Sequence, residues 1–148
     1  MFAQLDTKSV YSFMDSVVDL NTYVKRAKEL GYQSIGLMDR DNLYAAYHFA
    51  QLAIRNGLRP LIGTEANLFY EGRKIPFRLL AKNNQGYKNL MKLATELSSG
   101  QREFTYFSDY LNDIALILPS EDWEPGMSLG SEVFIGVRPE DAGKEFDY

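Results

Sequence analysis

The chain has 148 residues, of which 45% are hydrophobic and 24% charged, a composition typical of one ordinary globular domain with its own core. Its net charge is −4, from 16 Lys and Arg against 20 Asp and Glu. This balance argues against a main nucleic-acid-binding surface in this segment but does not exclude a local basic patch. The absence of cysteine excludes disulfides, thiolate zinc sites and a cysteine nucleophile. No stretch approaches the roughly 20 apolar residues of a membrane span, and no signal peptide opens the chain, so we expect a cytoplasmic domain without membrane contact.

Short apolar segments alternate with amphipathic ones along the chain. The pattern predicts strands at residues 2–5, 34–38, 60–63 with an extension as far as 69, 75–80, 113–118 and 132–137, and helices at 20–30, 43–56 and from 83 or 84 to near 100. Asp19 or Asn21 can cap the first helix, Asn42 the second, and Asn83 or Asn84 the third.

The alternation of strands and helices predicts the fold class. Right-handed crossovers imply a mostly parallel sheet, whereas the turn at Glu71 and Gly72 predicts one β-hairpin. About five or six strands are too few to close a barrel. We therefore expect an α/β fold: a partial or distorted (β/α) barrel of mostly parallel strands alternating with helices.

Charged side chains follow three of the predicted strands. Asp6 and Lys8 follow the first, Asp39 and Arg40 the second, and Glu65 the third. An α/β barrel builds its active site where its strands end, so we expect these side chains to meet at one barrel mouth. The layout is typical of a metal-dependent hydrolase, but an ammonium or guanidinium group has no lone pair for a metal.

Four blocks of sequence, in order, carry a resemblance to a known family. They are FAQLDTKSVYS at residues 2–12, LMDRDNLYAA at 37–46, PLIGTEA at 60–66 and LLAKNNQGYKNL at 79–90. They resemble the FxHLHxHSxYS, LTDHGNLYGA, PIIGCEA and LLAKNxxGYxNL blocks of the N-terminal PHP (polymerase and histidinol phosphatase) domain of bacterial DNA polymerase III alpha subunits. The start of the chain is most similar to the alpha subunit of low-GC Gram-positive bacteria. The resemblance implies that residues 1–148 form a truncated portion of a PHP-type barrel, with palm, fingers and thumb beyond residue 148.

The departures from the family blocks bear on chemistry. In metal-bearing PHP domains the His-x-His, Asp-His and Glu of the first three blocks help to bind up to three ions that activate water. Here those histidines are replaced by Asp6, Lys8 and Arg40, and a further family histidine falls at Pro76. The resemblance thus implies no catalytic residue, no metal and no cofactor in this segment. We expect instead a relict pocket, in which two cations compensate three carboxylates, formed by Asp6, Lys8, Asp39, Arg40 and Glu65. The alternative is a set of unrelated solvated loop charges.

The resemblance also implies a function. The chain would be a metal-free scaffold and interaction module of a DNA-directed DNA polymerase that uses Mg²⁺ in its palm. Its partners would be the palm and thumb of the same enzyme and other replisome proteins, and DNA only through the full-length enzyme. One rival function is a residual metal-dependent phosphoesterase acting on pyrophosphate or a 3′ nucleotide end. Another is a free-standing adaptor unrelated to replication.

Three further features have alternative interpretations. His48, the single histidine, fits a partly packed helix residue better than a catalytic one. Lys82, Lys88 and Lys92 form a basic strip that is either a solvated helix face or a contact to a DNA backbone. Trp123 is either an anchor for another protein or a loop residue folded onto the barrel.

Overall fold

A computed structural model describes residues 3–12, 18–130 and 132–137. It contains one sheet of six strands in the order of the chain: β1 (Ala3–Gln4), β2 (Ser34–Arg40), β3 (Arg59–Tyr70), β4 (Arg73–Ala81), β5 (Ile114–Pro119) and β6 (Val133–Gly136). Three helices accompany it: α1 (Leu20–Glu29), α2 (Ala46–Arg55) and α3 (Asn84–Ser98). Two 3₁₀ helices, Phe104–Tyr110 and Ser120–Asp122, precede and follow β5.

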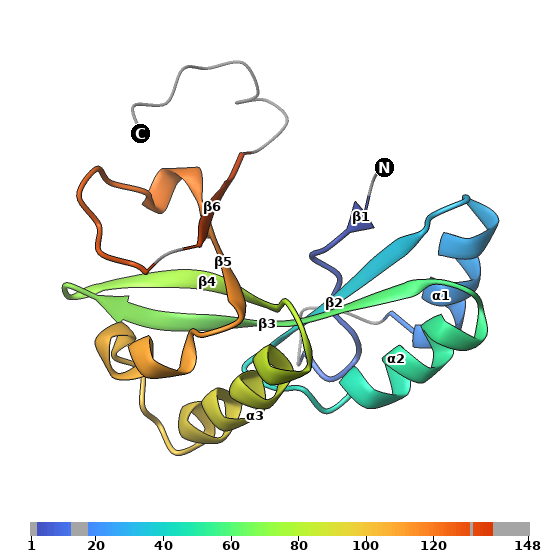
Figure 1. Cartoon of the computed structure of the whole chain (residues 1–148), viewed down its shortest axis with the longest axis horizontal. Helices are drawn as coiled ribbons and strands as arrows, with labels where there is room; N and C mark the ends of the chain where they lie inside the picture. The colour runs from blue at the N-terminus through green and yellow to red at the C-terminus, as the bar shows by residue number, and fades with distance from the viewer. Residues whose placement is uncertain (1–2, 13–17, 131, 138–148) are drawn as a thin grey trace.

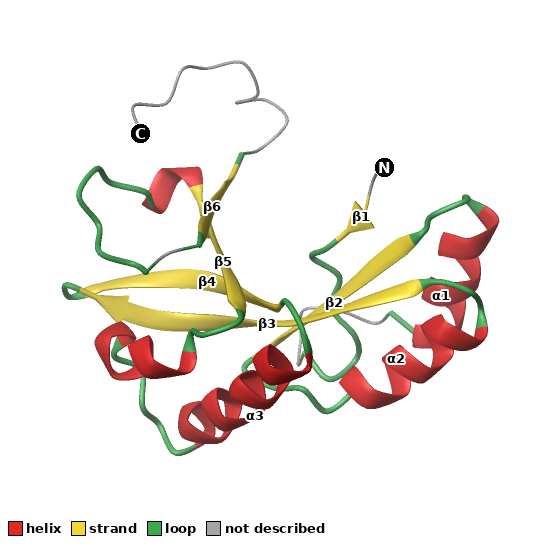
Figure 2. Ribbon diagram, in the orientation of Figure 1, coloured by secondary structure: helices red, strands yellow, loops and turns green. Residues whose placement is uncertain are grey.

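The sheet is mixed and curled. β1, β2 and β3 run parallel, β3, β4 and β5 are antiparallel neighbours, and β5 and β6 run parallel again. The three helices lie on one side of the sheet, and β1 and β6 at its two edges curve away from them toward the opposite side (Figures 1 and 2). Within the described residues nothing pairs with the outer edges of β1 and β6. The prediction of a partial barrel with mostly parallel strands and one hairpin is therefore confirmed.

Two hydrophobic clusters fill the space between sheet and helices. The smaller one packs α1 and α2 against β2, with Phe49 fully buried beside Ile35. The larger one packs α3 and the 3₁₀ helix Phe104–Tyr110 against the hairpin, around the buried Phe77. Because side chains alternate along each strand, the polar residues between these apolar ones point to the inner side of the curl.

Two of the predicted helix caps and the predicted hairpin turn form as expected. Asp19 accepts a hydrogen bond from the Thr22 N–H at the start of α1, and Asn83 accepts one from Gly86 at the start of α3. Glu71 and Gly72 have positive φ of 49° and 78°, as a two-residue type I′ hairpin turn requires. That turn places Tyr70 opposite Arg73 and fixes the register of the whole hairpin.

Three expectations need correction, and one element was not predicted. The helix predicted from residue 43 begins at Ala46, because Asn42 accepts a hydrogen bond from Tyr44 N–H and closes a separate turn. The aromatic stretch around Phe107 is helical, which the sequence analysis did not predict. His48 is exposed and not partly packed. Of the first predicted strand only Ala3–Gln4 pairs, and Phe2 and residues 138–148 lie outside the described part.

Two further findings complete the fold. Trp123 packs against the larger hydrophobic cluster, as the interpretation of a loop folded onto the barrel requires. In the described part of the chain, the helices all fall short of the length and apolar character that a bilayer span requires.

Candidate functional site: a charge cluster where the strands end

Glu65 on β3 is the centre of a cluster of charges on the inner side of the sheet. Its side chain is only 6% exposed. The parallel register places Arg40 of β2 beside it, and the antiparallel register places Arg78 of β4 on its other side. Arg40 donates to Glu65 Oε1 from Nε at 3.2 Å and from a terminal nitrogen at 3.1 Å. A terminal nitrogen of Arg78 lies 3.7 Å from Glu65 Oε2.

Lys8 links Glu65 to a second carboxylate in the loop after β1. Its ammonium lies 3.1 Å from Glu65 Oε2 and 2.9 Å from Asp6 Oδ1, and its side chain is 16% exposed. Arg78 Nε reaches the other oxygen of Asp6 at 2.8 Å. Partial burial acts to raise the pKa of Asp6, but the bonds and charges of Lys8 and Arg78 outweigh it, so the pKa lies below its ordinary value.

Together these five residues, Asp6, Lys8, Arg40, Glu65 and Arg78, are called the charge cluster below. Two carboxylates in it face three cations, whereas the sequence analysis expected three carboxylates and two cations. The cluster joins the loop after β1 and the last residue of β2 to the interior of β3 and β4, because β3 continues to Tyr70 and does not end near Glu65 as expected. Its members are not unrelated solvated loop charges, since one carboxylate is shared by cations from three segments.

Asp39 does not belong to this cluster, which corrects the expected convergence of three carboxylates. It precedes Arg40 in β2, so the two side chains point to opposite faces of the sheet. Asp39 is 1% exposed and accepts three hydrogen bonds, from Ser9 N at 2.6 Å, Ser9 Oγ at 2.7 Å and Ser12 Oγ at 2.7 Å. Among the residues that the structure describes, no cation forms a salt bridge with Asp39.

The bonds of Asp39 explain how Lys8 is positioned. They fix the loop immediately after Lys8, and the Met38 N–H donates to the Thr7 carbonyl at 2.8 Å on its other side. Gly36 allows the loop to approach β2, since a Cβ atom there would lie 2.6 Å from the Leu5 carbonyl oxygen. The loop is thus held at both ends of the segment that carries Asp6 and Lys8.

Arg78 was missed in the sequence analysis, although a signal for it exists. A two-residue turn at Glu71 and Gly72 pairs residues symmetrically about it, and that register places Arg78 opposite Glu65. Ser9 and Ser12 were missed as well. Their role depends on a loop conformation that no periodic pattern encodes.

The donor set does not fit a resident metal centre. No group of three His, Cys, Asp or Glu side chains that could hold an ion occurs in the described part of the chain. Asp6 and Glu65 are already bound by ammonium and guanidinium groups. Pro76 on β4, at the position of a further family histidine, pairs with Asn67 on β3 and offers no lone-pair nitrogen.

Comparisons with known proteins show the family of the chain. A profile of the PHP domain family matches residues 4–124, so the chain belongs to the PHP domain family. It is similar to the DNA polymerase III subunit alpha of Streptococcus pyogenes serotype M1, with 49% identity over 93% of this chain and 13% of the relative. The corresponding Bacillus subtilis protein is 33% identical over 81% of this chain and 11% of the relative. The chain thus spans only a small part of these relatives.

A solved structure supports the same fold. A putative metal-dependent phosphoesterase from Bifidobacterium adolescentis superposes with a TM-score of 0.53 and 18% identity, over 64% of this chain and 32% of that one. At this identity the likeness concerns the fold alone. The predicted family and fold class are both confirmed.

Proposed function

We propose that the chain is a metal-free scaffold and interaction domain of a bacterial replicative DNA polymerase III alpha subunit. The observation that carries this proposal is the position of Lys8 and Arg40. These two cations bind Glu65 where metal-bearing members of the family have histidine ligands. Fixed positive charges then supply the compensation that metal ions would supply, without any means of activating water.

The similarity to polymerase alpha subunits supports the proposal that this domain is part of a DNA polymerase. The parent enzyme would polymerise DNA with Mg²⁺ bound in its palm, and this domain would contact the palm and thumb and other replisome proteins. It would reach DNA only through the full-length enzyme. Bacterial replication takes place in the cytoplasm, where the proposal therefore places the chain. The segment described here carries none of the polymerase chemistry.

A metal titration distinguishes this function from a residual phosphoesterase. We expect no stoichiometric zinc, manganese or iron in the purified chain by elemental analysis. Hydrolysis of pyrophosphate and of a 3′-terminal nucleotide should stay at background when Mn²⁺ is added, while a PHP domain with its full histidine set serves as the positive control. A Mn²⁺-dependent rate that is lost in a folded Glu65→Gln variant would contradict the proposal.

A further inference from the structure

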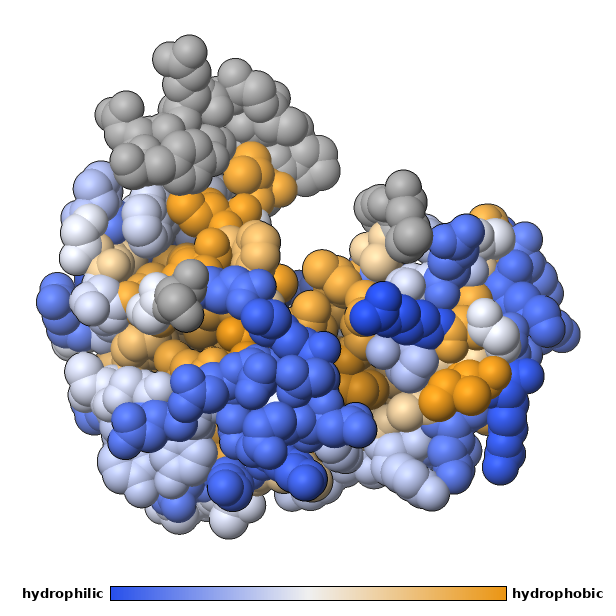
Figure 3. All heavy atoms as spheres, in the orientation of Figure 1, coloured by the Kyte–Doolittle hydropathy of each residue, from blue (hydrophilic) through white to orange (hydrophobic). Residues whose placement is uncertain are grey.

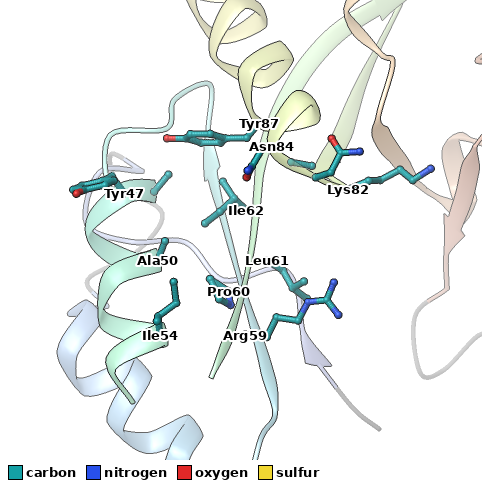
Figure 4. A pocket seen from close by; sticks show the side chains of 13 residues that line it. Tyr47, Ala50, Ile54, Arg59, Pro60, Leu61, Ile62, Lys82, Asn84 and Tyr87 are labelled. Atoms are coloured by element: carbon teal, nitrogen blue, oxygen red, sulfur yellow. The ribbon is translucent and has the colours of Figure 1, made fainter. Parts of the chain in front are cut away.

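A groove runs between α2 and α3 on the helical side of the sheet. It consists of two hollows of about 330 Å³ each, which share Tyr87 as a common wall. The first lies over the beginning of β3, and Figure 4 shows Ala50, Ile54, Pro60 and Ile62 along it. The second lies between the loop after β2 and α3. The groove lies outside the charge cluster, whose residues line neither hollow.

Large apolar side chains along this groove are left uncovered. Tyr44 is 75% exposed, Tyr47 70% and Ile54 65%, and Met91 on α3 is also exposed. Tyr47 and Tyr87 stand at one end of the first hollow, from opposite helices (Figure 4). Tyrosine and methionine are enriched at protein interfaces, and adjacent exposed groups of this size are typical of a contact surface. Single exposed apolar residues would need no such explanation.

The charge around the groove has a sign opposite to that of the chain. α2 and α3 together carry Arg55, Lys88 and Lys92 but only one acid, Glu96. Glu96 accepts a hydrogen bond from the Tyr106 hydroxyl, so it is engaged with the 3₁₀ helix. Lys88 follows Tyr87 directly and shares the exposed flank of α3 with Met91. In a chain of net charge −4, this flank is locally basic.

We propose that the groove docks a short amphipathic segment of another protein, apolar along one side and acidic along the flank that faces Lys88. This inference rests on the proposed interaction role and specifies its partner. An apolar side fits a floor made by Ile54, Pro60 and Ile62, and acidic residues complement the basic flank. A nucleic-acid backbone fits less well, because phosphates require a row of available cations. Only Arg59 and Lys82 line the first hollow beside its apolar residues, and Lys82 pairs with Glu132.

Selection from a random peptide library displayed on phage tests the proposal on the 148-residue chain. We expect enriched peptides with Leu, Ile or aromatic residues at helical spacing and Asp or Glu on the flank. Fluorescence anisotropy with the enriched peptide should show binding about fivefold or more weaker for Ile54→Ala and for Lys88→Glu. The matched controls are Leu30→Ala at the C-cap of α1 and Lys28→Glu on α1. Both residues are exposed and line neither hollow, so these variants should bind as the wild type does.

Three results would overturn the proposal. One is the absence of enriched peptides, or enriched peptides that bind all four variants equally. Another is binding of an oligothymidylate that Ile54→Ala abolishes, which would assign the groove to nucleic acid. The last is self-association of the wild type that Ile54→Ala abolishes, which would assign the groove to a second copy of the chain. None of these results changes metal content or hydrolysis, so the metal-free scaffold role is tested independently.

Discussion

Glu65→Gln should be among the most destabilising single changes in the chain. The substitution keeps the size of the side chain but removes the charge that binds Lys8, Arg40 and Arg78. Asp6 is then the one remaining carboxylate of the charge cluster for three cations. At 3.1 Å and an effective dielectric constant of about 20, one such contact amounts to about 5 kcal/mol of Coulomb energy. Desolvation of both ions offsets much of this energy in the intact pair. Removing one partner leaves the desolvation of the other uncompensated, which costs about 3–5 kcal/mol for a buried pair.

Urea unfolding followed by circular dichroism measures this loss. A matched control is Arg26→Ala, which breaks the pair with Glu29 on α1, where the two side chains are 66% and 50% exposed. The free energy of unfolding of that control should fall by only about 0–1 kcal/mol. Arg40→Ala should exceed the control, although Arg40 is more exposed than Lys8. The double variant Lys8→Met/Glu65→Gln should lose less stability than Glu65→Gln alone, because it also removes one of the three cations that Glu65 binds.

The reasoning fails if Glu65→Gln unfolds at the same urea concentration as the Arg26→Ala control. It fails equally if the double variant is no more stable than Glu65→Gln, since the loss would then not arise from repulsion among cations. Either result would reduce the charge cluster to a set of contacts without a role in stability. The proposal that fixed cations replace metal ions would lose its energetic basis.

Three further predictions concern the loop and the open edge. Asp39→Asn leaves buried donors without an acceptor, so the free energy of unfolding should fall by about 3 kcal/mol and amide exchange of Ser9 should become faster. Unchanged exchange would contradict the role of Asp39 in fixing the loop. The lowered pKa of Asp6 stabilises the fold fully above its unfolded pKa of about 3.9, and this contribution is lost as pH falls through the lower folded value. The fall in urea midpoint between neutral and acid pH should therefore be smaller for Asp6→Asn, and an equal fall would exclude this contribution. The open edge at β6 carries Phe134, which is 51% exposed, so light scattering should rise with concentration and Phe134→Lys should reduce the rise; a strictly monomeric wild type would show that the edge is covered.

The apolar face of the open sheet explains the last of these predictions. Figure 3 shows hydrophobic residues gathered along the inner side of the curl over β5 and β6. Such a surface next to an unpaired strand edge is a template for association. The groove between α2 and α3 lies on the other side of the sheet. Association that survives Ile54→Ala but is reduced by Phe134→Lys would therefore be assigned to the edge.

Much of the fold could be predicted because it depends on local signals. Asp19 and Asn83 precede helices with clear apolar periodicity, and a Glu-Gly turn separates two strands of matching pattern. The 3₁₀ helix around Phe107 was missed for a physical reason. It is too short for a helical period to stand out, and its conformation is fixed by burying Phe104 and Phe107 against the hairpin.

The candidate site could be predicted only in part. Parallel pairing of β2 with β3 places Arg40 beside Glu65, and the loop after β1 brings Lys8 to it, as the sequence predicted. Asp39 was misplaced because the strand was predicted to end at residue 38, whereas β2 continues to Arg40 and alternation turns Asp39 to the other face. Its bonds to Ser9 and Ser12 depend on a loop conformation, which tertiary contacts decide.

The charge cluster and Asp39 have separate roles, neutralising charge and holding segments together, which a metal centre combines. A bound ion both neutralises its ligands and ties the segments that supply them. Here Lys8, Arg40 and Arg78 neutralise Glu65 and Asp6, while the hydrogen bonds to Asp39 fix the loop that delivers Lys8. An ion-pair network requires neither a metal supply nor an open coordination position. Under the proposed function, these segments would stay joined although the metal chemistry is lost, as a domain retained for its shape and contacts requires.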